Sequence, residues 1–202
     1  MPIWMVFIMR VSRKADFYQF LHLIALAVCL ALIAYPSDAA IPGIEIDYVN
    51  CDLSEGFYFL DAHMSVELSD ESKKALVHGI PLRFDIEIKI IEKRDWLWDK
   101  TIFSNMIIYR LSYQPLTNYY IVTNISNGRR QQFFNLDEVL DYLGNIENHK
   151  LFEFERFPVN RNYAGLMRAR LNIKALPTPL KPLAYISSQW HLASQWIEWR
   201  LE

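Results

Sequence analysis

The stretch Leu82-Arg-Phe-Asp-Ile-Glu-Ile-Lys-Ile90 shows the clearest alternation of apolar and charged residues in the chain. A period of two is typical of a β-strand, because successive side chains of an extended backbone point to opposite faces of the sheet. One face of this strand would cover a hydrophobic core and the other would meet water. We therefore expect an antiparallel sheet with Asp85 and Glu87 on its solvent face.

The alternation recurs on both sides of this stretch. Gln114-Pro115 separates a predicted strand over residues 101–113 from one over residues 119–126. Asn127-Gly128, which follows the second of these strands, is typical of a tight hairpin turn. Further strands are predicted to begin at Ile44 and to cover residues 57–68 and 163–174, with a last strand through Ala193, Ile197, Trp199 and Leu201.

Two short helices interrupt the strands. Ser69 can cap a helix over residues 70–78, and Asn135 with Glu138 can cap a second helix that ends at Gly144. Strands and helices do not alternate, so a parallel sheet is disfavoured. The pattern predicts a mainly β fold, an antiparallel two-layer β-sandwich that is Ig-like in style and has two short helices. A β-barrel is the alternative, because the pattern does not tell whether the sheet closes.

The first forty residues have the features of a signal peptide. An apolar run over residues 23–35 follows the basic Arg10, Arg13 and Lys14 and precedes a segment of small residues. We expect residues 1–40 to be this peptide, with cleavage near Ala39, and a single sandwich domain over residues 41–202.

Met9 is an alternative start of the chain. In a signal peptide the basic residues come first, whereas here the apolar residues 1–8 precede Arg10, Arg13 and Lys14. Export through this peptide predicts a periplasmic protein. The alternative is an inner-membrane anchor formed by residues 17–35, and membrane association is expected only through such an uncleaved segment.

Composition excludes several classes of protein. The formal net charge of -2 over 202 residues gives no basic field for nucleic acid, so no nucleic-acid partner is expected. The two cysteines do not make a plausible disulfide, because Cys29 lies inside the apolar run and Cys51 beyond it. Cys51 is better explained as a small buried apolar side chain than as a nucleophile.

The sequence contains no familiar catalytic motif. It has neither the His-x-x-x-His nor the Cys-x-x-Cys spacing of a zinc site, no Gly-x-Ser-x-Gly turn and no phosphate-binding glycine loop. His63, His78, His149 and His191 are scattered and are expected to be surface histidines. We therefore predict no catalytic residue, no metal ligand and no cofactor, and an enzyme is the less favoured class.

Two groups of residues are candidates for recognition. Trp96 and Trp98 lie in a turn with charged neighbours, where indoles suit contact with a protein, a glycan or a lipid headgroup. The favoured interpretation is that Trp96 and Trp98 fold back over the end of the sandwich. Arg168 and Arg170 share the outward face of their strand and could meet an acidic partner, or pair across strands with Glu87 or Asp85.

The end of the chain combines prolines with tryptophans. Pro177, Pro179 and Pro182 cannot lie inside a ladder of hydrogen bonds, so this crossing is expected to connect sheets or pass over an end. In the strand that follows, Trp199 would point into the core. Trp196 would lie on the opposite face, and we expect the proline crossing to cover it.

Several segments occur together in a familiar order. They are Ala75-Leu-Val-His-Gly-Ile-Pro-Leu-Arg-Phe-Asp-Ile-Glu-Ile88, Trp96-Leu-Trp98, Tyr109-Arg-Leu-Ser-Tyr-Gln-Pro-Leu-Thr-Asn-Tyr-Tyr120, Phe134-Asn-Leu-Asp-Glu-Val-Leu140, Arg168-Ala-Arg-Leu171 and the closing tryptophans. From about Ile44 to Leu201 the chain resembles the proteobacterial family called domain of unknown function 4390. The resemblance implies an exported protein without assigned activity, often encoded beside a sensor kinase of the nitrogen-regulation type.

These observations lead to three hypotheses of function. The first is an exported, periplasmic binding or accessory protein whose partner is an envelope protein or a sensor kinase. The second is a periplasmic hydrolase of unfamiliar type, which would need histidines and carboxylates to converge in a pocket. The third is a carrier of an apolar ligand, which would need a hollow interior.

Overall fold

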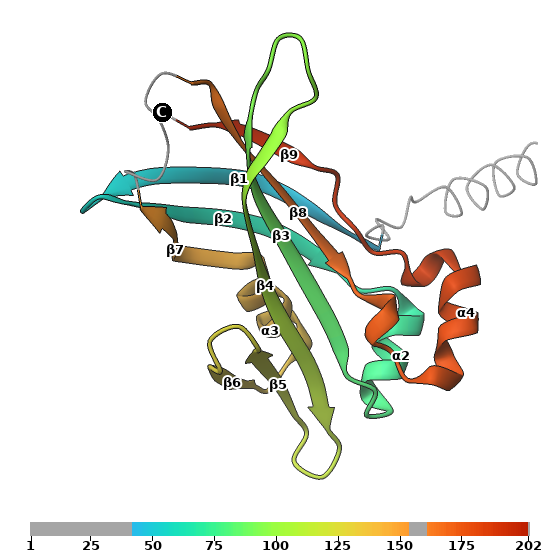
Figure 1. Ribbon diagram of the computed structural model, residues 1–202. Helices are drawn as coiled ribbons and strands as arrows, with labels where there is room; N and C mark the ends of the chain where they lie inside the picture. The colour runs from blue at the N-terminus through green and yellow to red at the C-terminus, as the bar shows by residue number, and fades with distance from the viewer. Residues whose placement is uncertain (1–41, 154–160, 202) are drawn as a thin grey trace, which may run out of the picture. The chain divides into compact units, whose positions relative to one another are not determined.

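The computed structural model describes residues 42–153 and 161–201. The predicted signal peptide, with its proposed cleavage site, lies outside the described residues. The described residues belong to a compact unit of residues 41–202 and form two antiparallel sheets (Figure 1). The small sheet has the order β1 (Gly43–Ser54), β2 (Phe57–Glu67), β7 (Asn145–Glu153), and the large sheet has the order β6 (Arg130–Phe133), β5 (Tyr119–Asn124), β4 (Lys100–Gln114), β3 (Leu82–Glu92), β8 (Tyr163–Leu171), β9 (Ile197–Arg200).

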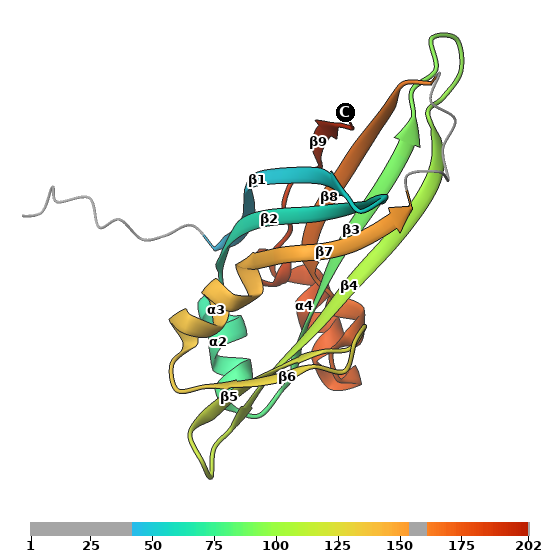
Figure 2. The same cartoon turned by 90° about the vertical axis from the view of Figure 1, so that its left-hand side faces the viewer.

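The prediction of a mainly β, two-layer antiparallel sandwich is confirmed. The small sheet lies against one face of the large sheet, with its strands running across those of the large one (Figures 1 and 2). Among the described strands neither sheet closes on itself, because β1 and β7 end one sheet and β6 and β9 end the other. The barrel alternative is therefore not realised.

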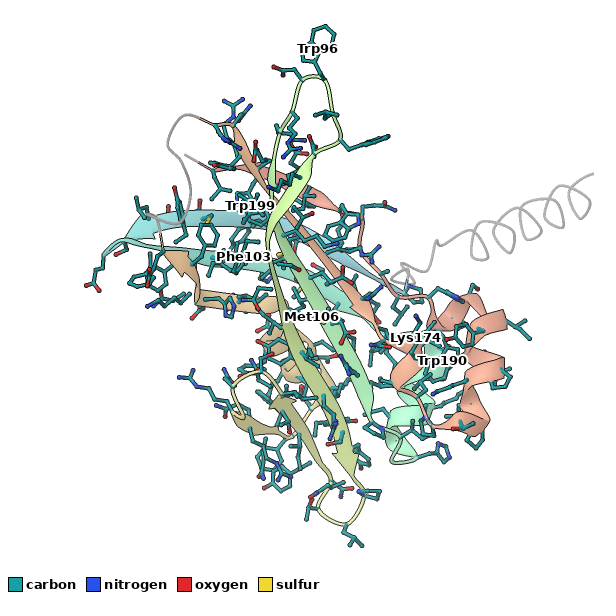
Figure 3. The ribbon with its side chains drawn as sticks, viewed as in Figure 1. Trp96, Phe103, Met106, Lys174, Trp190 and Trp199 are labelled. Carbon is teal, nitrogen blue, oxygen red and sulfur yellow. The ribbon has the colours of Figure 1, made fainter. Side chains whose placement is uncertain are left out.

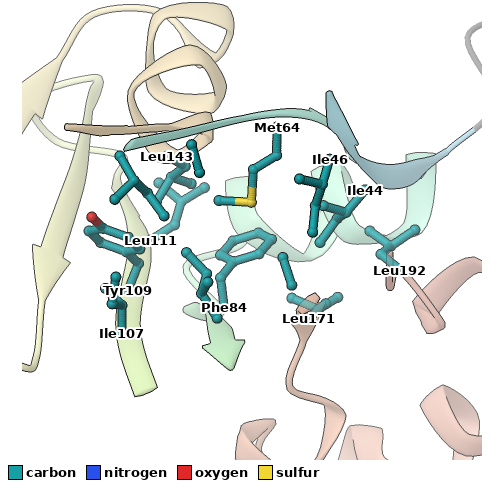
Figure 4. Close-up of a cluster of buried hydrophobic side chains, with 14 of the residues drawn as sticks. Ile44, Ile46, Met64, Phe84, Ile107, Tyr109, Leu111, Leu143, Leu171 and Leu192 are labelled. Atoms are coloured by element: carbon teal, nitrogen blue, oxygen red, sulfur yellow. The ribbon is translucent and has the colours of Figure 1, made fainter. Parts of the chain in front are cut away.

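The core is built on the stretch with the strongest alternation. Phe84, Ile86, Ile88 and Ile90 of β3 are almost fully buried, and Phe84 lies beside Met64 of β2 between the two sheets (Figure 4). Strand β3 pairs with β4 on one side and β8 on the other, so it is the central strand of the large sheet. This position explains why its apolar face is buried so completely.

The charged face of β3 differs from the prediction. Asp85 and Glu87 do not face open solvent: they are only 2% and 9% exposed. The expectation was wrong because alternation shows which face of a strand is apolar, whereas the covering of the polar face depends on neighbouring strands. Here long cationic side chains from β3 and β8 lie over the two carboxylates.

Both predicted helix starts are confirmed. Helix α2 (Asp70–Val77) begins after Ser69, whose hydroxyl accepts a hydrogen bond from the Ser72 amide at 3.2 Å. Helix α3 (Leu136–Gly144) begins after Asn135, which accepts from the Glu138 amide at 2.8 Å. The side-chain amide of Asn135 also donates to the Glu138 carboxylate, so the capping pair is reciprocal.

Strand β7 follows α3 at once and was not predicted. Its first part, Asn145-Ile-Glu-Asn-His-Lys150, is mostly polar, and Asn148 has a positive φ of 50°. The pairing with β2 shifts register twice over this strand, which breaks the alternation that identifies strands in a sequence.

The proline crossing contains a third helix, so the expectation of two helices was wrong. Helix α4 (Lys181–Ile186) stands between short 3-10 helices η2 (Ile173–Ala175), η3 (Thr178–Leu180) and η4 (Ser188–Trp190). Pro182 fits the first turn of α4, where the proline needs no amide hydrogen. The final strand is also shorter than predicted, because Ala193 makes only an isolated bridge with Arg170.

The last strand is held by an indole packed on a glycine. Trp199 of β9 lies opposite Gly165 of β8 and packs against the core, as predicted from its place in the alternation. A Cβ atom on Gly165 would lie 2.1 Å from the Trp199 ring, far inside contact distance. Gly165 is therefore the residue that admits the indole.

Cys51 of β1 packs against the core at its edge. Burial away from water raises the pKa of the Cys51 thiol to about 11. The thiol therefore stays protonated near neutral pH, which agrees with the interpretation of Cys51 as a packing residue.

We predict that Gly165→Ala destabilises the protein by about 2 kcal/mol, because the added methyl group displaces the Trp199 ring. Chemical denaturation of the full chain measures the loss. In a Trp199→Leu background the same substitution should cost much less, since the ring is gone. An equal loss in both backgrounds would contradict the contact.

We also predict that Cys51 of the folded chain reacts slowly with iodoacetamide near neutral pH and that its rate rises toward a midpoint near pH 11. Mass spectrometry of the Cys51 peptide measures the rate separately from that of Cys29. In denaturant the midpoint should return to the ordinary value of 9.0. A folded-state midpoint below that value would identify an activated thiolate instead.

Candidate functional site

The seven residues between β3 and β4 form an exposed loop, residues 93–99, which we call the tryptophan loop. Trp96 and Trp98 are 95% and 92% exposed, and Leu97 between them is 65% exposed. Trp96 lies at the tip of this loop, away from both sheets (Figure 3). The expectation that these indoles fold back over the sandwich is therefore wrong. The tryptophan loop is the end of the long hairpin formed by β3 and β4. Its tip extends past the two sheets, so the indoles have no sheet surface to pack on (Figure 3).

The neck of the tryptophan loop is fixed by polar contacts. The Lys93 ammonium lies 2.9 Å from a carboxylate oxygen of Glu198 on β9 and 3.3 Å from one of Asp99. Its amide donates to the carbonyl of Asn162, the residue before β8, at 2.9 Å. The hydrogen bond with Glu198 raises the pKa of Lys93, so its charge is retained. These contacts join the loop to the edge of the large sheet.

The second predicted group lies on the outer face of the large sheet. Arg170 lies 2.6 Å and Arg168 3.6 Å from the same Glu87 oxygen, while Lys89 lies 3.6 Å from the other oxygen. The predicted alternative of pairing across strands with Glu87 is confirmed. Asp85 instead pairs with Arg83, at 2.6 Å.

Trp196 contributes an aromatic ring to this outer face. The Lys89 ammonium lies 4.6 Å and the Arg168 guanidinium 4.8 Å from the ring centroid, which are cation–π distances. Trp196 remains 37% exposed, so the expectation of a covered ring was wrong. The side chains found over it are cations of the sheet, not the proline crossing.

A groove of about 340 Å³ lies where β8 ends. We call it the basic groove, after Arg168, Arg170, Lys174 and His191, which line it together with Tyr185 and the apolar Leu171 and Leu192. Of these residues, Arg168 and Arg170 were selected from the sequence. Lys174 belongs to the predicted strand 163–174 but was not selected. Tyr185 and His191 were missed because they come from the proline crossing and the segment after it, whose path no periodicity predicts.

The scattered histidines remain apart. His63 pairs with Asp47 at 2.7 Å, His149 lies 3.2 Å from the Asn105 amide nitrogen, and His191 lies 3.0 Å from the Ser187 carbonyl. Burial lowers the pKa of His149. Over residues 42–153 and 161–201 no group of three or more His, Cys, Asp or Glu side chains is placed to hold a metal ion.

An open cleft of about 700 Å³ beside α3 brings His149 near three carboxylates, those of Glu138, Asp141 and Glu147. All three acidic residues are exposed. Glu138 is held by the helix cap and Glu147 receives a hydrogen bond from Asn145 at 2.7 Å. The cleft thus offers a single histidine and solvated carboxylates, an arrangement that gives the hydrolase hypothesis little support. The space between the sheets is filled by the buried side chains shown in Figure 4. The hypothesis of a carrier with a hollow interior is therefore not supported.

Within the part of the chain that the structure describes, every helix is too short or too polar to cross a membrane. The segment that was considered as an anchor, residues 17–35, lies outside it.

Comparison with known proteins identifies the family and nothing more specific. No curated protein and no solved structure matches the chain. One protein family, described as a domain of unknown function (DUF4390), matches residues 42–200, which include both sheets and the basic groove. The chain therefore belongs to the domain of unknown function 4390 family.

Proposed function

We propose that this protein is an exported accessory protein that works by binding, and that its tryptophan loop docks on a protein of the cell envelope. The observation that supports this proposal is the nearly complete exposure of Trp96 and Trp98 at the tip of a hairpin. Exposing two indoles to water is unfavourable, and large exposed apolar groups mark sites of interaction. Tryptophan is also enriched, with tyrosine and arginine, among the residues that dominate binding energy at protein interfaces.

The neck of the loop supports the same proposal. Lys93 connects the loop to β9 through Glu198 and to the start of β8 through the Asn162 carbonyl. A loop held in this way loses less conformational freedom when it binds, and therefore more of the contact energy appears as affinity.

The charges around the indoles favour a protein over a lipid surface as the partner. The segment 93–100 contains three basic and two acidic residues, Lys93, Arg94 and Lys100 with Asp95 and Asp99. Segments that bind anionic membranes carry clusters of basic residues with little acid between them. Mixed charges around an apolar centre are instead the composition of the rim of a protein interface.

The proposed location rests on the pattern of the N-terminal residues, and the proposed partner rests on the family resemblance. The run of residues 23–35 with its basic flank supports export to the periplasm, either by cleavage near Ala39 or with residues 17–35 kept as an inner-membrane anchor. The resemblance to proteins encoded beside a sensor kinase makes that kinase the first partner to test. No observation favours the hydrolase or the carrier over this proposal.

We predict that crosslinking of the full chain in intact cells captures an envelope protein through the tryptophan loop, and that Trp96→Ser/Trp98→Ser reduces capture at least about tenfold, since such anchors carry most of the binding energy. Mass spectrometry should locate the crosslinks within residues 93–100. The matched control is Leu116→Ser, which removes a 99% exposed apolar residue from the tip of the β4–β5 hairpin.

Equal loss of capture in the control, or crosslinks that lie outside residues 93–100, would contradict the docking proposal. Vesicles of phosphatidylethanolamine and phosphatidylglycerol test the lipid alternative. If binding to them depends on both tryptophans while no protein is captured, the partner is the membrane surface.

Export is tested separately by N-terminal sequencing of the protein from the periplasmic fraction. We predict a mature chain that begins at Ala40 or within a few residues of it. A membrane-bound chain that still begins at Met1 or Met9 would favour the anchor, and a chain found only in the cytoplasm would contradict export.

A further inference from the structure

We propose that the basic groove binds a small organic anion, a molecule with one carboxylate or phosphate group on an apolar or aromatic body. The groove is separate from the tryptophan loop. The loop adjoins the start of β8 through Asn162, whereas the groove lies where β8 ends. The two sites therefore lie at opposite ends of one strand.

The charge of the lining is the first argument. Arg168, Arg170, Lys174 and His191 line the groove, and no aspartate or glutamate is among its lining residues. Glu87 neutralises part of this charge through Arg170 and Arg168. Lys174 is exposed, and within the described residues it has no carboxylate at ion-pair distance. A ligand anion would supply the counter-charge that the protein does not.

Arg168 provides a second, independent observation. Its Nε atom is buried and has no hydrogen-bond acceptor within the described part of the chain. A buried donor without an acceptor is unfavourable, and such groups are rare in folded proteins. The same side chain lines the groove and lies over the Trp196 ring, so its guanidinium is held in place beside the groove.

The shape of the groove argues for an organic anion over an inorganic ion. A volume of about 340 Å³ is many times that of a single phosphate and falls within the range of small-molecule sites. Tyr185 is 53% exposed on α4, and the buried Leu171 and Leu192 form part of the same lining. These three side chains offer an apolar wall, while the cations offer a place for one charged group.

The walls of the groove are fixed before any ligand binds. Asn172 donates its side-chain amide to the buried Asp85 and accepts from the Ala175 amide, so it sets the start of η2 and the position of Lys174. On the other side, the Leu171 amide donates to the Leu192 carbonyl at 2.8 Å, and Ala169 exchanges two hydrogen bonds with Ser194. A preformed site loses little entropy on binding. Figure 3 shows Lys174, whose position Asn172 sets in this way, beside the short helices of the C-terminal segment.

Isothermal titration calorimetry on the full chain tests the proposal with four probes. Phenyl phosphate and benzoate combine an anion with a ring, inorganic phosphate supplies the anion alone, and benzyl alcohol the ring alone. We expect one equivalent of phenyl phosphate or benzoate to bind, at least about tenfold more tightly than inorganic phosphate and benzyl alcohol. The preferred ring compound then distinguishes a phosphate site from a carboxylate site.

Substitutions of exposed residues locate the binding. Lys174→Gln should weaken the preferred probe about tenfold, because a charged hydrogen bond is lost, and Tyr185→Ser should weaken it less. Arg130→Gln, an exposed arginine on β6 at the opposite edge of the large sheet, is the matched control and should change nothing. Trp96→Ser/Trp98→Ser should also leave binding intact, which separates this proposal from docking by the loop.

Three outcomes would overturn the proposal. They are the absence of saturable binding by either ring compound, equal weakening by Arg130→Gln and Lys174→Gln, and inorganic phosphate binding as tightly as phenyl phosphate. The first removes the site, the second reduces it to general charge attraction, and the third removes the organic part of the ligand. Circular dichroism of each variant confirms that the fold is retained.

Discussion

Two carboxylates held almost out of water on the central strand β3 constrain the outer face of the large sheet. Burying a carboxylate is costly unless cations and hydrogen-bond donors surround it. Asp85 is met by Arg83 and Asn172, and Glu87 by Arg170, Arg168 and Lys89. The arginines of β8 therefore first serve to neutralise the buried Glu87 carboxylate. Only the positive charge that Glu87 does not neutralise is available to a ligand.

This constraint extends to the end of the chain. Asn172, once held by Asp85, caps η2 and so directs the proline crossing away from the sheet. The chain then returns along β8, first through residues 192–194 and then through β9, where Trp199 packs on Gly165. The tail is thus tied to β8 by hydrogen bonds along much of its length. The basic groove is the space left between the crossing and this returning segment.

The two proposed sites differ in how far they can be predicted from the sequence. The motif Trp96-Leu-Trp98 is visible in the sequence, yet its exposure is decided by the length of the β3–β4 hairpin, which carries the turn beyond the sandwich. In the basic groove, Arg168 and Arg170 follow from alternation along β8, whereas Tyr185 and His191 reach the same place only through the irregular path of the crossing. Periodicity predicts regular elements, and it carries no information about such a path.

By itself the sequence determined most of the strands, the caps Ser69 and Asn135, the mainly β antiparallel class and the inward direction of Trp199, because these depend on the pattern of a few neighbouring residues. Only the tertiary structure decided that Asp85 and Glu87 are buried, that α4 forms in the proline crossing, and that β7 continues from α3. The exposure of Trp96 and Trp98 was decided in the same way. These outcomes depend on contacts between residues far apart in the chain, and the energy of such contacts has no local signature.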